Sequence, residues 1–171
     1  MSALIPAWVE GVLTPVDKLA VHRQGLRHLA VSVFVLRDGM TLLQRRAAGK
    51  YHTPNLWANT CCTHPHWGED NLSCATRRLA EELGITGLAL TPVRQIEYRA
   101  EVGNGMTEHE VVQLFVAHAP PGLPLSPNPA EVRDTLWISP IDLHEALAAR
   151  PQDFTPWLRI YMRDHADALR F

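Results

Sequence analysis

The chain has 171 residues, of which 46% are hydrophobic and 20% charged, and its formal net charge is −2. This length suits one domain, and the small negative charge argues against a general affinity for nucleic acid or anionic membranes. No apolar run approaches the roughly 20 residues that a membrane helix needs. The three cysteines include the neighbours Cys61 and Cys62, so we expect free thiols and a cytoplasmic location.

The hydrophobic pattern predicts an α+β fold, with strands and helices mixed along the chain. Strands are expected, in chain order, over residues 29–36, 41–45, 56–60, 93–100, 110–117 and 131–138, and helices over 71–83, 139–150 and 155–169. The helix over 71–83 is the best marked, because Asp70 suits its N-cap and Gly84 follows its last turn. The mixture predicts a sandwich of helices around a mixed sheet.

Two carboxylates stand two residues apart in a run typical of a strand. Side chains two apart on a strand point to the same face, so Glu108 and Glu110 would converge while His109 points away. Two such carboxylates repel unless a cation lies between them or they share a proton. With His64 and Cys62 in the motif Cys-Thr-His-Pro, the pair predicts a metal site that carries an acid–base pair.

Residues 63–85 resemble the Nudix box, a loop and helix that hold a diphosphate through metal-binding glutamates. The matching residues are Glu69, Arg77, Leu79, Glu81, Glu82, Gly84 and Ile85. Thr63 stands where the box begins with glycine, and Arg78 stands in place of a metal-binding glutamate. Losing that carboxylate removes a ligand that Nudix hydrolases use to activate water. The departure therefore weakens hydrolysis as an interpretation and favours retention of a diphosphate.

A wider set of motifs is similar to the type I isopentenyl diphosphate isomerases, a Nudix branch, over about residues 17–157. A C-x-H-P motif beside a modified Nudix box, followed in order by Y-R-A and E-x-E, is highly specific. The resemblance implies one isomerase domain over 1–171, a Nudix-like α/β/α sandwich around a mixed β-sheet with extra N-terminal strands. Its core would span about 28–150, and a C-terminal helix over 155–169 would cover the active site.

The resemblance also implies a site with two cations. The ligands of one divalent metal, Mn²⁺, Mg²⁺ or Zn²⁺, would be His22, His28, His64, Glu108 and Glu110. A second cation, Mg²⁺, would lie on the substrate diphosphate, held by Glu82 with the backbone carbonyl of Cys62. Cys62 and Glu110 would form the catalytic pair, with Tyr98 assisting Glu110. The residues expected to bind substrate are Lys18, Arg46, Lys50 and Arg78 at the phosphates and Trp157 at the hydrocarbon tail.

The implied reaction converts isopentenyl diphosphate to dimethylallyl diphosphate in isoprenoid biosynthesis. A proton adds to the terminal alkene carbon and another leaves the allylic carbon, so a strong acid and a dry site are needed. We favour Glu110, made more acidic by a metal, as the acid and Cys62 as a thiolate base; the roles swap in the reverse direction. The π face of Trp157 would stabilise the cation by about 2 kcal/mol when desolvated.

Two other interpretations stay open. A Nudix pyrophosphohydrolase acting on a nucleoside or prenyl diphosphate would release phosphate or a nucleoside monophosphate, and Arg78 and Cys62 count against it. A non-catalytic module with a structural metal is the third, although structural zinc sites are usually closed and rich in Cys and His. The expected partner is a small-molecule substrate, bound by a monomer or homodimer. The other histidines, His52 among them, are expected at structural or surface positions.

Overall fold

The structure, a computed structural model, describes residues 3–169; the two residues at each end of the expected domain lie outside this description. The strands are β1 (Leu4–Val9), β2 (Val12–Asp17), β3 (Arg27–Arg37), β4 (Met40–Arg46), β5 (Trp57–Ala58), β6 (Cys61–Thr63), β7 (Thr91–Gly103), β8 (Met106–His118) and β9 (Val132–Ile138). The helices are α1 (Lys18–Gln24), α2 (Asn71–Leu83), α3 (Pro140–Ala149), a 3₁₀ turn (Pro151–Asp153), α4 (Pro156–Asp164) and α5 (Ala166–Leu169).

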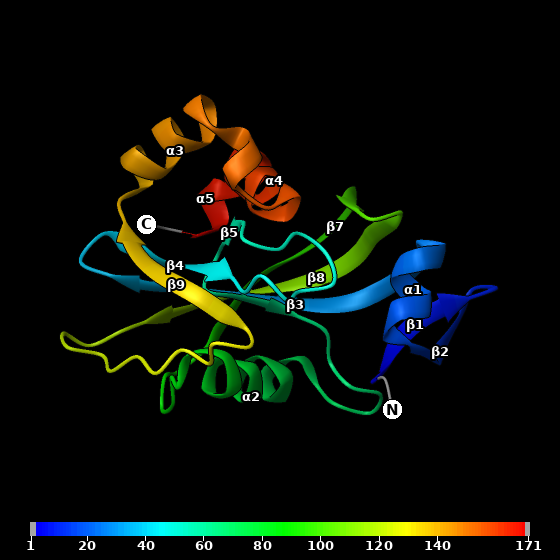
Figure 1. Ribbon diagram of the computed structural model, residues 1–171. Helices are drawn as coiled ribbons and strands as arrows, with labels where there is room; N and C mark the ends of the chain where they lie inside the picture. The colour runs from blue at the N-terminus through cyan, green and yellow to red at the C-terminus, as the bar shows by residue number, and fades with distance from the viewer. Residues whose placement is uncertain (1–2, 170–171) are drawn as a thin grey trace.

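The strands form one mixed sheet, with α2 on one face and α3, α4 and α5 on the other (Figure 1). β3 lies at its centre and runs parallel to β8 from Arg27 to Leu36, while β7 and β8 form a long antiparallel hairpin. The expected α/β/α sandwich is confirmed, and the extra N-terminal strands are the hairpin β1–β2. Within residues 3–169, no helix combines the length and apolar character needed to cross a bilayer.

Alternation along β3 sends its side chains to two separate cores. Val31, Val33 and Val35 pack on the α2 side, with Leu79 of that helix. Residues of the other parity, such as Phe34, pack on the side covered by α3, α4 and α5. Because neighbouring strands keep the same facing at each registered pair, this parity also decides which polar groups can meet.

The β3–β4 hairpin is paired over a short length only. The two strands pair only at Leu36–Thr41 and Arg37–Met40. Beyond that point β3 pairs with β6, and β4 pairs with β5 and β9. One cavity is lined by Cys62 of β6, by Arg78 and Glu82 of α2 and by Trp157 of α4, so groups from both layers of helices reach the same space.

Helix α2 has the predicted ends. The carboxylate of Asp70 accepts a hydrogen bond from the backbone N–H of Ser73 at 2.9 Å, which satisfies one of the free donors of the first turn. Gly84 ends the helix with φ of 68°, a conformation that glycine adopts without a Cβ penalty. The N-cap and the C-terminal glycine are both confirmed.

Three elements differ from the sequence prediction. The strand expected over 56–60 is split. The side chains of Asn59 and Thr60 form hydrogen bonds with backbone groups of β3 and β4, and these replace a regular ladder between strand backbones. The helix expected over 155–169 breaks at His165, whose φ and ψ of −137° and 13° leave the helical region, and becomes α4 and α5. Helix α1 was not predicted, and the sequence Lys18–Gln24 is short enough to lack a clear periodicity.

Candidate active site

The sheet register brings the expected catalytic groups to one face. Cys62 on β6 pairs with Ser32 of β3, and Glu110 on β8 pairs with His28 of the same strand. Tyr98 on β7 pairs with Glu110 in turn. Since His28 and Ser32 are four residues apart on β3, these side chains all point to the face covered by α4. His109 points away, as predicted, and contacts Glu97 on the exposed face.

Three histidines and one glutamate form a tight buried cluster. One donor atom from each of His22, His28, His64 and Glu108 lies within 4.8 Å of the others. Oxygen Oε2 of Glu108 is 3.1 Å from Nε2 of His22, 3.1 Å from Nε2 of His28 and 3.7 Å from Nε2 of His64. Glu110 joins at the edge, with Oε1 2.9 Å from Nε2 of His64. The structure thus brings together all five residues expected at the His/Glu metal site.

The protonation of this cluster fits a cation at its centre. Nδ1 of His22 lies 2.5 Å from the carbonyl of Lys18, and Nδ1 of His28 lies 2.7 Å from the carbonyl of Leu26. A carbonyl only accepts, so both rings donate Nδ1–H, and in their neutral form both direct an Nε2 lone pair at Glu108. Lone pairs facing a carboxylate need positive charge between them, and such backbone-oriented imidazoles are typical metal ligands.

Without a metal, a proton supplies part of that charge. Burial lowers the pKa of His28, but its contacts with Glu108 and Glu110 outweigh burial and raise the pKa to about 10. A divalent metal would displace this proton and satisfy the same carboxylates. The donor set of neutral imidazoles and carboxylates suits Mn²⁺, Mg²⁺ and Zn²⁺ to different degrees.

Cys62 and Glu110 line one cavity, together with groups from α2, α4 and the loop that precedes β5. Tyr98 donates a hydrogen bond from its hydroxyl to Oε2 of Glu110 at 2.6 Å, and both side chains are buried. The cavity volume is about 20 Å³, roughly enough for one water molecule. The site is therefore nearly dry, and its lining must part to admit a five-carbon chain.

The pKa shifts of Cys62 and Glu110 do not match the roles that the sequence analysis favoured, with Glu110 as the acid and a Cys62 thiolate as the base. Burial, followed by the charges of Glu110 and Glu108, raises the pKa of the Cys62 thiol well above its usual range. Burial and Glu108 also push the pKa of Glu110 upwards, but the bonds from His28 and His64 bring it below the ordinary value. The pair thus holds a thiol and a carboxylate, so a Cys62 thiolate acting as the base stays a prediction.

Basic side chains gather at the mouth of the cavity. All four expected phosphate-binding residues line it: Lys18, Arg46, Lys50 and Arg78. An adjoining cavity of about 170 Å³ shares three of them and opens beside β1 and α2. Burial, followed by repulsion from Lys50, lowers the pKa of Lys18 to about 8. A buried lysine whose pKa is lowered further by neighbouring cations indicates a place for an anion.

Acidic partners hold two of these cations. Arg78 contacts Glu82 at 2.5 Å and Glu131 at 3.4 Å, and Lys50 bonds the same Glu131. The other oxygen of Glu82 accepts a hydrogen bond from Gln44 at 2.7 Å. Glu82 lines the cavity with Cys62, as its expected role requires, but Arg78 would have to exchange this partner for a phosphate.

Helix α4 brings two aromatic side chains close to Cys62. Trp157 is 2% exposed and lies in the cavity wall, with the guanidinium of Arg46 5.2 Å from its ring centroid. Tyr161, which the sequence did not single out, places its hydroxyl 3.9 Å from Sγ of Cys62. Only the helical phase of α4 relative to Trp157, four residues earlier, could have suggested it.

His52 is a correction to the sequence analysis. It was expected at a structural or surface position, but it is 2% exposed and its Nε2 lies 2.9 Å from Oε1 of Glu108. His52 stands in an irregular loop between β4 and β5, where no periodicity relates it to the strands. Its position two residues after Lys50 was the one sequence signal that pointed towards the site.

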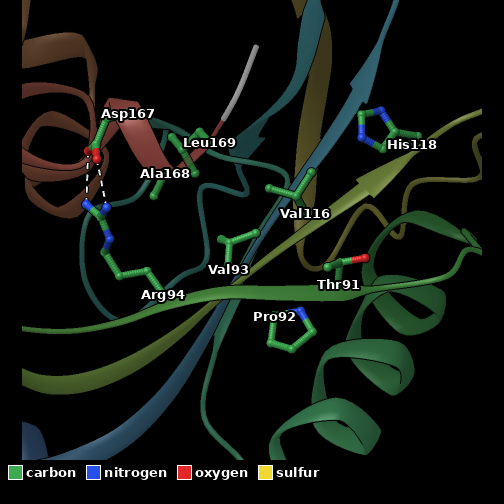
Figure 2. Close-up of a pocket in the computed structure, with 9 residues that line it drawn as sticks. All are labelled: Thr91, Pro92, Val93, Arg94, Val116, His118, Asp167, Ala168 and Leu169. Carbon is green, nitrogen blue, oxygen red and sulfur yellow. Dashed lines mark hydrogen bonds and ion pairs between the residues drawn. The ribbon is translucent and has the colours of Figure 1, made fainter.

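A larger cavity lies elsewhere, between the start of β7, the end of β8 and α5 (Figure 2). Its volume is about 490 Å³, and an exposed ion pair between Arg94 and Asp167 closes one side. Both charges are satisfied by each other, and none of the expected site residues lines it. The larger volume therefore does not identify this cavity as the active site. The expected catalytic residues and the buried charged groups line the small cavity instead.

Comparison with known proteins shows the family to which the chain is related. The family model of the NUDIX domain matches residues 26–158. An isopentenyl-diphosphate Delta-isomerase from Cereibacter sphaeroides is 59% identical over 169 residues, which cover 99% of this chain and 96% of that protein. One of the same name from Rhodobacter capsulatus is 60% identical over 166 residues, covering 97% of this chain and 94% of that protein.

Two solved structures illustrate the fold. A crystal structure of a Deinococcus radiodurans protein has a TM-score of 0.75 at 16% identity, covering 95% of this chain and 98% of that one. A MutT NUDIX hydrolase from Burkholderia pseudomallei has a TM-score of 0.63 at 24% identity, covering 82% of this chain and 98% of that one. At such identities the likeness shows the Nudix fold alone, and the predicted fold class is confirmed.

Proposed function

Because the chain belongs to the isopentenyl-diphosphate Delta-isomerase family, within the Nudix superfamily, we propose that it converts isopentenyl diphosphate to dimethylallyl diphosphate in isoprenoid biosynthesis. The observation that carries the proposal is the shared cavity of Cys62 and Glu110, one a thiol and the other a carboxylate held by Tyr98. A buried carboxylate and a half-buried thiol in a small cavity suit protonation of an alkene, a reaction with which water would compete.

The basic mouth orients the substrate. The cations of Lys18, Arg46, Lys50 and Arg78 bind the diphosphate, which exchanges places with Glu131 and Glu82 at two of them. Anchoring this end directs the five-carbon tail inwards, between Cys62 and Glu110, and converts proton transfer into a reaction between fixed neighbours. The diphosphate itself is not cleaved.

Proton transfer then requires one group to donate and the other to accept. One member of the Cys62–Glu110 pair adds a proton to the terminal alkene carbon, and the other removes a proton from the allylic carbon, so the double bond moves and the net charge is unchanged. Tyr98 holds the carboxylate of Glu110 in place, and Trp157, which lines the same cavity, would stabilise the cationic centre with its ring. The reverse reaction uses the same two groups with their roles exchanged.

Two divalent cations would support this arrangement. His22, His28, His64, Glu108 and Glu110 would hold one divalent metal, for which Mn²⁺, Mg²⁺ and Zn²⁺ are the candidates. Glu82 and the backbone carbonyl of Cys62 would hold Mg²⁺ on the diphosphate. A metal on Glu110 supplies positive charge that makes a proton on that carboxyl more acidic.

The three cysteines are free, which supports the proposed cytoplasmic location. The partner that the proposal requires is a small diphosphate, and no nucleic acid or membrane takes part. The site is complete within one chain, so a monomer and a homodimer would both be competent.

Nuclear magnetic resonance in D₂O tests the function. The protein is incubated with isopentenyl diphosphate, Mg²⁺ and Mn²⁺, and the products are followed by proton and phosphorus spectra. The proposal predicts dimethylallyl diphosphate with deuterium in a methyl group and no free phosphate. Release of phosphate without isomerisation would support a pyrophosphohydrolase instead, and an unchanged substrate would support a non-catalytic metal-binding module.

A further inference from the structure

His52 contacts the metal-binding cluster from outside. The three ring nitrogens of His22, His28 and His64 surround Oε2 of Glu108, whereas Nε2 of His52 faces the other oxygen, Oε1, at 2.9 Å. Among the described residues, no group forms a hydrogen bond of regular geometry with this buried nitrogen, so its 2.9 Å contact with Oε1 is an ion-pair distance. The two oxygens of Glu108 are thus divided between the cluster and His52.

The ring of His52 is held on its other side. Nδ1 lies 2.9 Å from the hydroxyl oxygen of Thr53. Two donors of Arg46 bond the carbonyls of His52 and Thr53, each at 3.2 Å, and so tie this turn to β4. The edge of the ring also packs against Trp157, with centroids 5.9 Å apart. These contacts leave the imidazole little freedom to leave Glu108.

The backbone at this turn is strained. Thr53 has φ of 45°, in the left-handed region that β-branched residues rarely occupy. Such a conformation costs on the order of 1–3 kcal/mol and persists only where the surrounding structure requires it. Here it directs the hydroxyl of Thr53 to Nδ1 of His52, which supports the orientation of the ring towards Glu108.

We propose that His52 is a positioning residue that holds Oε1 of Glu108, so that Oε2 stays directed at the three imidazole nitrogens. A carboxylate only accepts, so the proton of His52 lies on Nε2, and the hydroxyl of Thr53 donates to Nδ1. This inference rests on the proposed metal site and adds a residue to it that acts through Glu108. Groups that orient a ligand in this way typically change metal affinity by 10–100-fold.

Metal titration of the chelator-treated protein tests the inference. Binding of Mn²⁺ is measured by calorimetry for the wild type, His52→Leu, His52→Gln and Thr53→Val. We expect His52→Leu to weaken binding by about 10–100-fold, and His52→Gln, whose amide keeps a donor, to recover most of the loss. Thr53→Val keeps the imidazole and its β-branched shape, so it should weaken binding less than His52→Leu.

His109→Leu provides the matched control, because His109 adjoins Glu108 in the chain but points to the opposite face. Its metal affinity should equal that of the wild type. Thermal unfolding of the metal-free proteins identifies any variant that has lost its fold; if His52→Leu has, Thr53→Val and His52→Gln decide the question.

Two results would overturn the inference. One is equal Mn²⁺ affinity in the wild type and a folded His52→Leu protein. The other is a pulsed electron paramagnetic resonance spectrum of bound Mn²⁺ in which His52→Leu removes one imidazole nitrogen, since His52 would then be a ligand itself. A wild-type protein that binds no divalent metal would instead refute the proposed metal site on which the inference depends.

Discussion

The hydroxyl of Tyr98 makes the clearest test of how Glu110 is held. It donates to Oε2 of Glu110 at 2.6 Å, in a region where Tyr98 is 7% and Glu110 1% exposed. Burial and the charge of Glu110 raise the pKa of Tyr98 well above its usual range, so the hydroxyl keeps its proton and remains a donor. Tyr98→Phe removes this one bond and leaves the ring in place.

A hydrogen bond to a charged group is worth about 1.5–3 kcal/mol. If the bond is needed at the transition state, its loss lowers kcat by about 10–150-fold, since 1.36 kcal/mol corresponds to tenfold. The KM for isopentenyl diphosphate should change little, because Tyr98 does not line the basic mouth. Steady-state kinetics gives both constants, and thermal unfolding shows whether the protein remains folded.

Tyr51→Phe is the matched control, because its hydroxyl lies in the same region but contacts Nε2 of His22 at a long 3.4 Å. Its kcat should fall by less than about threefold, as expected for so weak a bond. A Tyr98→Phe protein with wild-type kcat, or with a changed KM alone, would refute the reasoning about Glu110.

Two further predictions concern charge and fold. The pKa of Lys18 is lowered to about 8, so its positive charge is lost as the pH rises above that value; kcat/KM should fall there, and Lys18→Arg, which stays charged, should lack this fall. Gly84→Ala should lower the free energy of unfolding more than Gly39→Ala. Both glycines have positive φ, but an added Cβ at Gly84 would lie 2.7 Å from Cβ of Ser126, whereas at Gly39 it meets nothing within 4 Å. Chemical denaturation should show that Gly39→Ala, which adds backbone strain alone, lowers the free energy of unfolding by about 1–2 kcal/mol. Gly84→Ala should lower it by more.

Local patterns predicted much of the fold and the convergence of Glu108 and Glu110, whereas the resemblance to a family supplied most of the other expected site residues. The ends of α2 were marked by Asp70 and Gly84, since capping needs only a few adjacent residues. The convergence of Glu108 and Glu110 followed from the two-residue period of a strand. These features depend on short stretches of chain, so the sequence alone contains them.

Other features depend on contacts between distant segments. The strand expected over 56–60 was interrupted because Asn59 and Thr60 bond β3 and β4, which are far away in sequence. His52 lies in a loop, and only the folded path of that loop brings it to Glu108. The pairing of Lys50 and Arg78 with Glu131 likewise joins residues more than 50 positions apart. No spacing rule predicts such contacts.

The loss of one sulfur atom tests the central claim most directly. Cys62→Ala is incubated with isopentenyl diphosphate in D₂O, and formation of dimethylallyl diphosphate is compared with the wild type while substrate binding is measured by calorimetry. The account predicts a fall in turnover of at least about 100-fold with nearly unchanged affinity, because the basic mouth stays intact. Isomerisation at a rate close to that of the wild type would contradict the account, since proton transfer would then not need the thiol.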